Sequence, residues 1–282
     1  MRLRSLLFVP GDRPDRFEKA VSAGADAVIF DLEDAVSPDR KPFARSAVIE
    51  RLASASHGPA RLVRVNALDS GSIDEDLEAL RHGPPDAIML PKAEGATSVR
   101  ALEARLAMAG LPKMPVLPIA AETPSAVFGL AGYRDVADAL LGLTWGAEDL
   151  TTAVGASAGR EPDGRFTPPY EIARALTLFA ATAAATRPIE TVYPAVRDLA
   201  GLDAFARRAA RDGFTGMLAI HPDQVAPINA AFTPGDELVR RARAIVAAFA
   251  ASPGAGAIRL DGGMIDAPHL KQARLLLERV DG

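Results

Sequence analysis

Eight short apolar runs alternate with amphipathic segments along this chain of 282 residues, and no other feature constrains its fold as strongly. Each run has the length and composition of a buried parallel strand, and the intervening segments repeat their apolar residues at helical spacing. Eight strand–helix units predict an α/β fold of the closed (β/α)8 type, the TIM barrel. The runs are Leu3–Val9, Ala27–Leu32, Arg61–Val65, Ala87–Leu90, Val116–Ala121, Ala139–Trp145, Ile189–Tyr193 and Met217–Ile220.

A doubly wound open sheet is the competing fold for such an alternation. That fold usually carries a glycine-rich phosphate loop after its first strand, and the sequence VPGDRPDR matches neither GxGxxG nor a Walker motif. We therefore assign residues 1–232 to a barrel. Residues 233–282 exceed what eight repeats need, and they predict a C-terminal helical extension that covers part of the molecule.

Composition excludes several classes of function. The chain has no Cys, so any metal must have oxygen or imidazole ligands, which favours a hard cation such as Mg²⁺. A net charge of −4 and an aromatic content of 5% argue against nucleic acid as a partner. No apolar stretch reaches membrane-spanning length without a charge or a breaker, so we expect a cytoplasmic protein with no membrane partner.

Two carboxylates stand directly behind apolar runs, Glu122 in PIAAETP and Asp149 in WGAEDL. Strand ends of a barrel meet at one mouth, where an unpaired carboxylate is expensive to bury, so the two together predict a divalent metal site. In the alternative, structural interpretation, Glu122 caps a helix that begins near Thr123 and Asp149 caps one that begins near Thr151.

Arg64 lies near the end of the third run, so we expect its side chain to point into the same mouth. Its planar guanidinium suits a carboxylate or a developing enolate, with Glu33 or Asp34 holding it in place. A buried structural pair of arginine and glutamate is the alternative, and the two roles are compatible.

Other basic residues near strand ends have simpler interpretations. Lys92 follows the fourth run and could form a Schiff base, but Glu94 beside it favours a charged ammonium group. Arg13 and Lys19 follow the first run, where the residue pattern alone favours a solvated surface helix. His221 is interpreted as a structural hydrogen-bonding residue rather than a base.

Taken together, the motifs resemble those of the citrate lyase beta-subunit-like proteins. These proteins belong to the HpcH/HpaI aldolase superfamily, which includes malyl-CoA and citramalyl-CoA lyases. The resemblance covers nearly the whole chain and rests on LFVPGDRPDRFEKA, FDLEDAV, VRVNALDS, MLPKAE, AAETP, WGAEDL, GFTG, IHPDQV and MIDAPHLKQA.

The resemblance implies a (β/α)8 barrel and a Mg²⁺-dependent carbon–carbon lyase. Such an enzyme cleaves or forms a short 3-hydroxyacyl-CoA, with an acyl-CoA and a 2-oxo acid as the other reactants. By motif, Glu122 and Asp149 are similar to the family's magnesium ligands, and Arg64 to the arginine at the oxo acid and the thioester. Together with Arg64, the acidic residues Glu33 and Asp34 of FDLEDAV are candidate catalytic residues.

The same resemblance assigns roles to both ends of the chain. Arg13 and Lys19 would contact the phosphates of CoA, in place of the surface role that their pattern suggests. Asp266 of MIDAP resembles the catalytic acid that the family's C-terminal lid inserts into a neighbouring subunit, in a homotrimer or a hexamer with exchanged lids. The alternative for Asp266 is to cap a helix that begins near Pro268.

Three functions remain compatible with the motifs. The first is the lyase, the second is a thioester hydrolase of the malyl-CoA thioesterase type, and the third is the citryl lyase beta subunit of a citrate lyase complex. Met217 departs from the family pattern, since many relatives carry lysine there, and the Gly-rich insertion Gly155–Phe166 is a further place for specificity differences. The substrate therefore stays open.

Overall fold

The computed structural model describes residues 2–54 and 58–281. Within these ranges eight parallel strands lie side by side around a barrel in the order β5-β4-β3-β2-β1-β8-β7-β6. Their sequence order matches their spatial order, as the repeated strand–helix alternation requires. The strands are β1 (Ser5–Pro10), β2 (Ala27–Asp31), β3 (Ala60–Arg64), β4 (Ala87–Leu90), β5 (Val116–Pro118), β6 (Gly142–Leu143), β7 (Arg187–Glu190) and β8 (Gly216–Ala219).

The barrel closes between β5 and β6, the two strands at the ends of that order. Parallel bridges join Val116 to Leu140 and Ile119 to Thr144, and the N–H of Ala120 donates to the carbonyl of Thr144 at 2.7 Å. The regular strands are shorter here than the apolar runs, but their hydrogen bonding continues beyond them. The predicted (β/α)8 barrel is confirmed, and the open doubly wound sheet is wrong.

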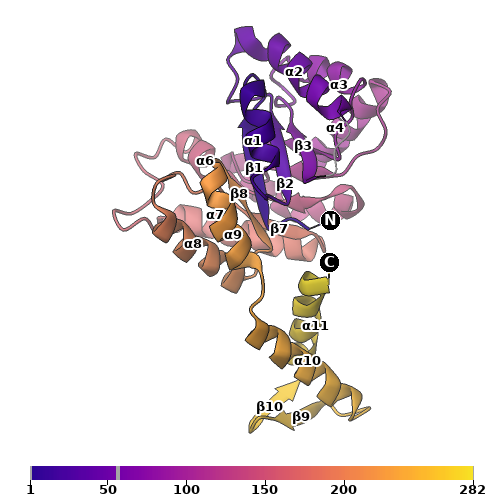
Figure 1. Cartoon of the computed structure of the whole chain (residues 1–282), viewed down its shortest axis with the longest axis vertical. Coiled ribbons are helices and arrows are strands. Elements are labelled where there is room, and N and C mark those ends of the chain that lie inside the picture. The colour runs from indigo at the N-terminus through magenta and orange to yellow at the C-terminus, as the bar shows by residue number, and fades with distance from the viewer. Residues whose placement is uncertain (1, 55–57, 282) are drawn as a thin grey trace. The chain divides into compact units, whose positions relative to one another are not determined.

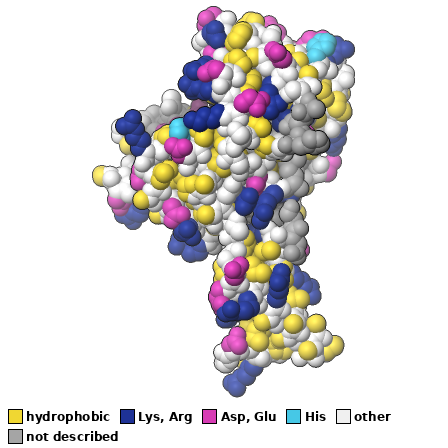
Figure 2. Space-filling view, in the orientation of Figure 1, with side chains coloured by type: hydrophobic (Ala, Val, Ile, Leu, Met, Phe, Trp, Pro, Cys, Tyr) yellow, Lys and Arg dark blue, Asp and Glu magenta, His cyan; other side chains and the backbone are white. Residues whose placement is uncertain are grey.

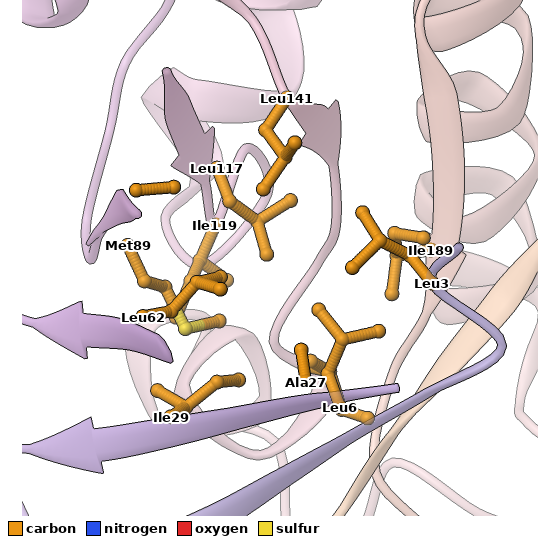
Figure 3. Close-up of a cluster of buried hydrophobic side chains, with 12 residues drawn as sticks. Leu3, Leu6, Ala27, Ile29, Leu62, Met89, Leu117, Ile119, Leu141 and Ile189 are labelled. Atoms are coloured by element: carbon orange, nitrogen blue, oxygen red, sulfur yellow. The ribbon is translucent and has the colours of Figure 1, made fainter. Parts of the chain in front are cut away.

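The inside of the barrel is filled with apolar side chains from the strands and the residues that flank them (Figure 3). Alternate residues of one strand point to opposite faces, so Ala27 and Ile29 enter the interior while Val28 and Phe30 face the surrounding helices. This packing makes the barrel a solid core rather than a channel. Polar chemistry is therefore confined to the mouth at the carboxyl ends of the strands.

Helices surround the strands of the larger unit, Leu3–Asn229 (Figure 1). In the described ranges no helix is both long enough and apolar enough to cross a membrane. The α-helices are α1 (Phe17–Val21), α2 (Lys41–Ala53), α3 (Ile73–Leu80), α4 (Ala96–Met108), α5 (Pro124–Gly129), α6 (Ala147–Ala153), α7 (Pro168–Ala183) and α8 (Leu199–Asp212), and the 3-10 helices are η1 (Pro14–Arg16), η2 (Pro38–Arg40), η3 (Leu130–Ala139) and η4 (Pro222–Gln224).

A smaller compact unit begins at Ala230, within α9 (Val225–Phe232). Its described residues form two helices and a β-hairpin, which was not predicted from the sequence. The hairpin turn is Asp261–Gly262, whose φ angles of 51° and 77° are those of the type I′ turn that Asp-Gly favours. Its elements are α10 (Asp236–Ala250), β9 (Ala257–Leu260), β10 (Gly263–Asp266) and α11 (Ala267–Asp281).

Candidate active site

Arg64 ends β3 and stands opposite Asp31, the last residue of β2, in the register of the two strands. The Nε and Nη2 atoms of Arg64 donate to the two oxygens of Asp31 at 2.7 and 2.6 Å, and Nη1 lies 2.9 Å from Glu33. Burial alone would lower the pKa of Arg64, but the neighbouring carboxylates raise it. Arg64 is therefore a fixed cation at the mouth of the barrel.

Glu33 also pairs with Lys92, which follows β4. The Nζ atom of Lys92 lies 2.6 Å from Glu33 and 3.7 Å from Asp34. Burial alone would lower the pKa of Lys92, but the hydrogen bond and the charge of Glu33 raise it, so the lysine stays protonated and does not suit Schiff-base chemistry. Of the two acids that were expected to hold Arg64, Glu33 does so, whereas Asp34 faces Lys92, with 55% of its side chain exposed.

Glu122 lies four residues beyond the end of β5, with its side chain buried. Its Oε2 atom accepts a 2.6 Å hydrogen bond from the backbone N–H of Lys92, a residue in the left-handed conformation with a φ of 51°. The helix cap of α5 is Thr123, whose Oγ1 accepts from the N–H of Ala126 at 3.1 Å. The capping alternative for Glu122 is therefore wrong.

Gly146 brings Glu122 and Asp149 into the same part of the mouth. A Cβ atom at position 146 would lie 2.6 Å from Cγ and 2.8 Å from Oε1 of Glu122, so the carboxylate packs directly on the glycine. Gly146 is also the N-cap of α6, and Asp149 follows in the first turn. Asp149 is thus not the cap, and its charge acts on both Glu122 and Lys92.

Burial and charge around Glu122 fit a cation. Burial raises the pKa of Glu122 to about 8, and the charges of Asp149 and Glu33 contribute in the same direction. A divalent cation would offset these like charges. No group of three or more His, Cys, Asp or Glu side chains in residues 2–54 and 58–281 is arranged for a metal. Two carboxylates, with other positions left to water and substrate, nevertheless suit Mg²⁺.

A groove of about 530 Å³ lies beside the carboxyl ends of β1 and β8. Lys19, one of the two predicted CoA contacts, lines this groove together with Arg16, which the sequence analysis did not select. Arg13 is not among the lining residues and instead pairs with Asp15, at 2.8 and 2.9 Å. His221 also lines the groove, and its Nδ1 accepts from the N–H of Asp223 at 3.2 Å, a structural role as expected.

Asp266 lies in the smaller unit, at the end of β10 and directly before α11. Its Oδ1 atom is 2.6 Å from Nδ1 of His269, and both side chains are 49% exposed. The carboxylate thus contacts the His269 ring, and its exposure leaves it open to a partner.

Two further features concern specificity. Met217 is fully buried on β8, where it stands next to Glu190 of β7 in the strand register, so no cation occupies that position. The insertion after α6 folds back on itself through a bridge between Arg160 and Phe166. Phe166 also helps to line a groove of about 730 Å³ with Glu171 and with other residues of the insertion and α8.

Comparison with known proteins identifies the family of this chain. The profile of the HpcH/HpaI aldolase/citrate lyase family matches residues 4–222. The chain belongs to that family. A citrate lyase subunit beta-like protein of Mycobacterium tuberculosis is 37% identical over 97% of this chain and 94% of its own length. The human mitochondrial citramalyl-CoA lyase is 31% identical over 96% of this chain and 83% of its own length.

Among solved structures, one is similar to this chain over its whole length. The crystal structure of the protein CitE from M. tuberculosis, in complex with magnesium, acetoacetate and coenzyme A, superposes with a TM-score of 0.82. The two chains are 34% identical, and the match covers 100% of this chain and 99% of the other. The fold expected from the resemblance is thus the fold of this family.

One important partner in the site was missed from the sequence. Asp31, the last residue of β2, was not among the predicted site residues, yet it accepts hydrogen bonds from both Nε and Nη2 of Arg64. The signal lay in the repeat itself, because Asp31 and Arg64 end consecutive parallel strands and must therefore be neighbours.

Proposed function

We propose that the chain is a Mg²⁺-dependent carbon–carbon lyase. It would cleave or form a short 3-hydroxyacyl-CoA such as malyl-CoA or citramalyl-CoA, with an acyl-CoA and a 2-oxo acid as the other reactants. The observation that carries the proposal is the buried carboxylate of Glu122, packed on Gly146 and within reach of the charges of Asp149 and Arg64. The names of the citramalyl-CoA lyase and of the magnesium complex of CitE support the same chemistry.

In this proposal Glu122 and Asp149 hold the metal, and Arg64 binds the carboxylate of the oxo acid. When bound, Mg²⁺ would polarise the carbonyl group of the oxo acid and neutralise the charge that develops on it. The N–H groups of Arg64 that do not contact Asp31 or Glu33 can donate to the substrate. These two partners fix the orientation of the guanidinium. A preoriented fork of this kind stabilises developing negative charge without reorganisation.

The proton transfers require one further carboxylate. In the cleavage direction this group takes the proton of the 3-hydroxyl, the carbon–carbon bond breaks, and its electrons form the enolate of the acyl-CoA, which then takes a proton at its α-carbon. We assign the transfers to Asp266 of a neighbouring subunit. Glu33 and Asp34 then serve the reaction by holding Arg64 and Lys92 in place.

The groove beside β1 and β8 would bind the CoA part of the substrate. Lys19 and Arg16 bring two positive charges to this groove, and phosphate groups favour such contacts. Arg13, paired with Asp15 at the edge of the groove, would join them only by exchanging that partner for a phosphate.

We further propose that the chain forms a homotrimer or a hexamer in which residues 233–282 act as an exchanged lid. The outer face of α7 exposes Ile172, Leu176 and Phe179, a row of apolar residues that supports coverage by a second copy. The smaller unit also exposes hydrophobic side chains on the face that Figure 2 shows. The exposed hydrophobic residues of the unit include Leu238, Met264 and Leu275.

A panel of malyl, methylmalyl, citramalyl and citryl thioesters tests the proposal. With saturating Mg²⁺, the purified protein should release an oxo acid and an acyl-CoA from at least one CoA thioester, and Asp149→Ala should abolish this without unfolding the protein. Free CoA together with a free hydroxy acid would select the thioesterase instead. Cleavage of citryl-acyl carrier protein alone would select the citrate lyase subunit, and cleavage of none would refute the proposal.

A further inference from the structure

Glu190 is a fully buried carboxylate that the proposed reaction does not use. It ends β7, and three donors converge on it. Its Oε1 atom accepts from the indole Nε1 of Trp145 at 2.7 Å and from the N–H of Thr191 at 2.9 Å. Its Oε2 atom accepts from Nε of Arg174 at 2.5 Å.

Trp145 connects this carboxylate to the candidate metal site. It lies in the loop between β6 and α6, immediately before Gly146, the residue on which the side chain of Glu122 packs. Asp149 lies three residues after Gly146 in the sequence. The backbone on which the indole is anchored therefore leads directly to the contact of Gly146 with Glu122 and to Asp149.

Arg174 and Trp145 each have a further contact. Nη1 of Arg174 lies 2.8 Å from Asp212 at the end of α8. The ring of Trp145 packs on Phe166 of the insertion, with 4.9 Å between the ring centroids. The indole is thus fixed by a hydrogen bond at its polar edge and by an aromatic contact at its ring.

Burying a carboxylate and a guanidinium is expensive, and apolar side chains of similar volume often stabilise a core at least as well. A buried charged pair is therefore weak evidence for a purely stabilising role. In the pair of Glu190 and Arg174, the carboxylate of Glu190 accepts a hydrogen bond from Nε1, the one polar atom of the Trp145 side chain, at a defined place in the core. That directional contact is what an apolar replacement would lack.

We propose that Glu190 is a positioning residue for the candidate magnesium site. Through its hydrogen bond to Trp145 it fixes the turn at Gly146, and that turn sets the separation of Glu122 and Asp149. The inference rests on the proposed function in one respect, namely that the cation is Mg²⁺. It extends that function by adding a fully buried residue outside the set of metal ligands.

Trp145→Phe is the decisive variant, because it removes the indole N–H and keeps an aromatic ring against Phe166. Glu190→Gln is the second variant, although it also leaves Arg174 without its buried carboxylate and lowers stability. The affinity for Mg²⁺ should fall about tenfold or more in each, as is usual when the support of a metal ligand is removed. Calorimetric titration with Mg²⁺ measures this affinity without any thioester substrate.

The protein also contains its own spectroscopic reporter. Trp145 is the single tryptophan of the chain, so its emission should change as Mg²⁺ is added, and in Glu190→Gln the same change should require about tenfold more Mg²⁺. Asp26→Asn is the matched control. It weakens the pair of Asp26 and Arg4 at the amino ends of the strands, away from the mouth, and should leave the affinity unchanged.

Two results would overturn the inference, and they are distinguishable. Folded variants that bind Mg²⁺ within twofold of the wild type would show that the network only stabilises the core, and the proposed function would stand. A wild-type protein that does not bind Mg²⁺ at all would refute the proposed metal and, with it, this role of Glu190.

Discussion

The guanidinium of Arg64 and the carboxylate of Asp31 form a two-point contact between the last residues of adjacent parallel strands, at 2.7 and 2.6 Å. Because both residues belong to regular strands, the backbone as well as the side chains fixes this pair. Glu33 holds the remaining terminal nitrogen at 2.9 Å. The orientation of the Arg64 guanidinium is therefore fixed before any substrate binds, as a preorganised site requires.

Arg64→Lys tests whether this orientation matters for catalysis. Lysine keeps the charge but cannot make a two-point contact with Asp31, so we expect kcat/KM to fall about a hundredfold or more while the melting temperature changes little. Steady-state kinetics at saturating Mg²⁺ measures the effect. Arg207→Lys, at an exposed pair with Asp203, is the control. A threefold loss or less in Arg64→Lys would argue against a role at the substrate.

Gly146→Ala tests the contact between Glu122 and the start of α6. The added Cβ would approach Cγ of Glu122 to 2.6 Å, so the carboxylate must move away. We expect about a tenfold loss of Mg²⁺ affinity in a folded protein, measured by calorimetry. Gly132→Ala is the control, since its Cβ would have no neighbour nearer than 3.6 Å. Equal affinities in the two variants would exclude the metal site from this position.

The fold could be predicted from the sequence because its signal is repeated eight times. Each apolar run followed by a helical pattern is weak evidence alone, but only a closed barrel uses eight such units in sequence order. Strand ends also placed Glu122, Asp149 and Arg64 at one mouth. These predictions needed only the period of the pattern and the fact that parallel strands end on the same side.

Contacts between side chains could not be predicted in the same way. Glu33 or Asp34 was expected to hold Arg64, and Glu33 does so, but the two-point contact comes from Asp31, which the strand register places opposite Arg64. The support of Lys92 by Glu33 joins residues 59 positions apart. Such pairings depend on the side-chain direction and on the exact strand ends, and both are decided by tertiary packing.

Lys19→Ala tests the groove beside β1 and β8 as the site of the CoA phosphates. Loss of one cation from the groove should raise the KM for the acyl-CoA about tenfold and leave kcat nearly unchanged, because the contact would bind substrate and transition state equally. The difference should shrink at high salt. Lys113→Ala, on an exposed pair with Asp138, is the control. An unchanged KM would place the phosphates elsewhere.

Arg174→Met tests the energetic side of the buried network. The substitution leaves Glu190 as a carboxylate in the core without its cation, so we expect the free energy of unfolding to fall by about 3–5 kcal/mol. Urea unfolding followed by Trp145 fluorescence measures it. Arg207→Met removes a comparable but exposed pair and should change stability by less than about 0.5 kcal/mol. Similar losses in both would mean that Glu190 is satisfied without Arg174.

Mixing two inactive variants tests whether the site is shared between subunits. Asp266→Ala lacks the proposed proton-transfer group and Glu122→Gln lacks a proposed metal ligand, so each homo-oligomer should be inactive. If Asp266 acts in a neighbouring subunit, some mixed assemblies combine an intact barrel with an intact lid, and random one-to-one assembly restores about a quarter of the wild-type sites. If Asp266 acts within its own chain, every site keeps one defect. Co-expression with two affinity tags isolates the mixed species, and its activity per site decides between the two arrangements: a value near zero would rule out the exchanged lid.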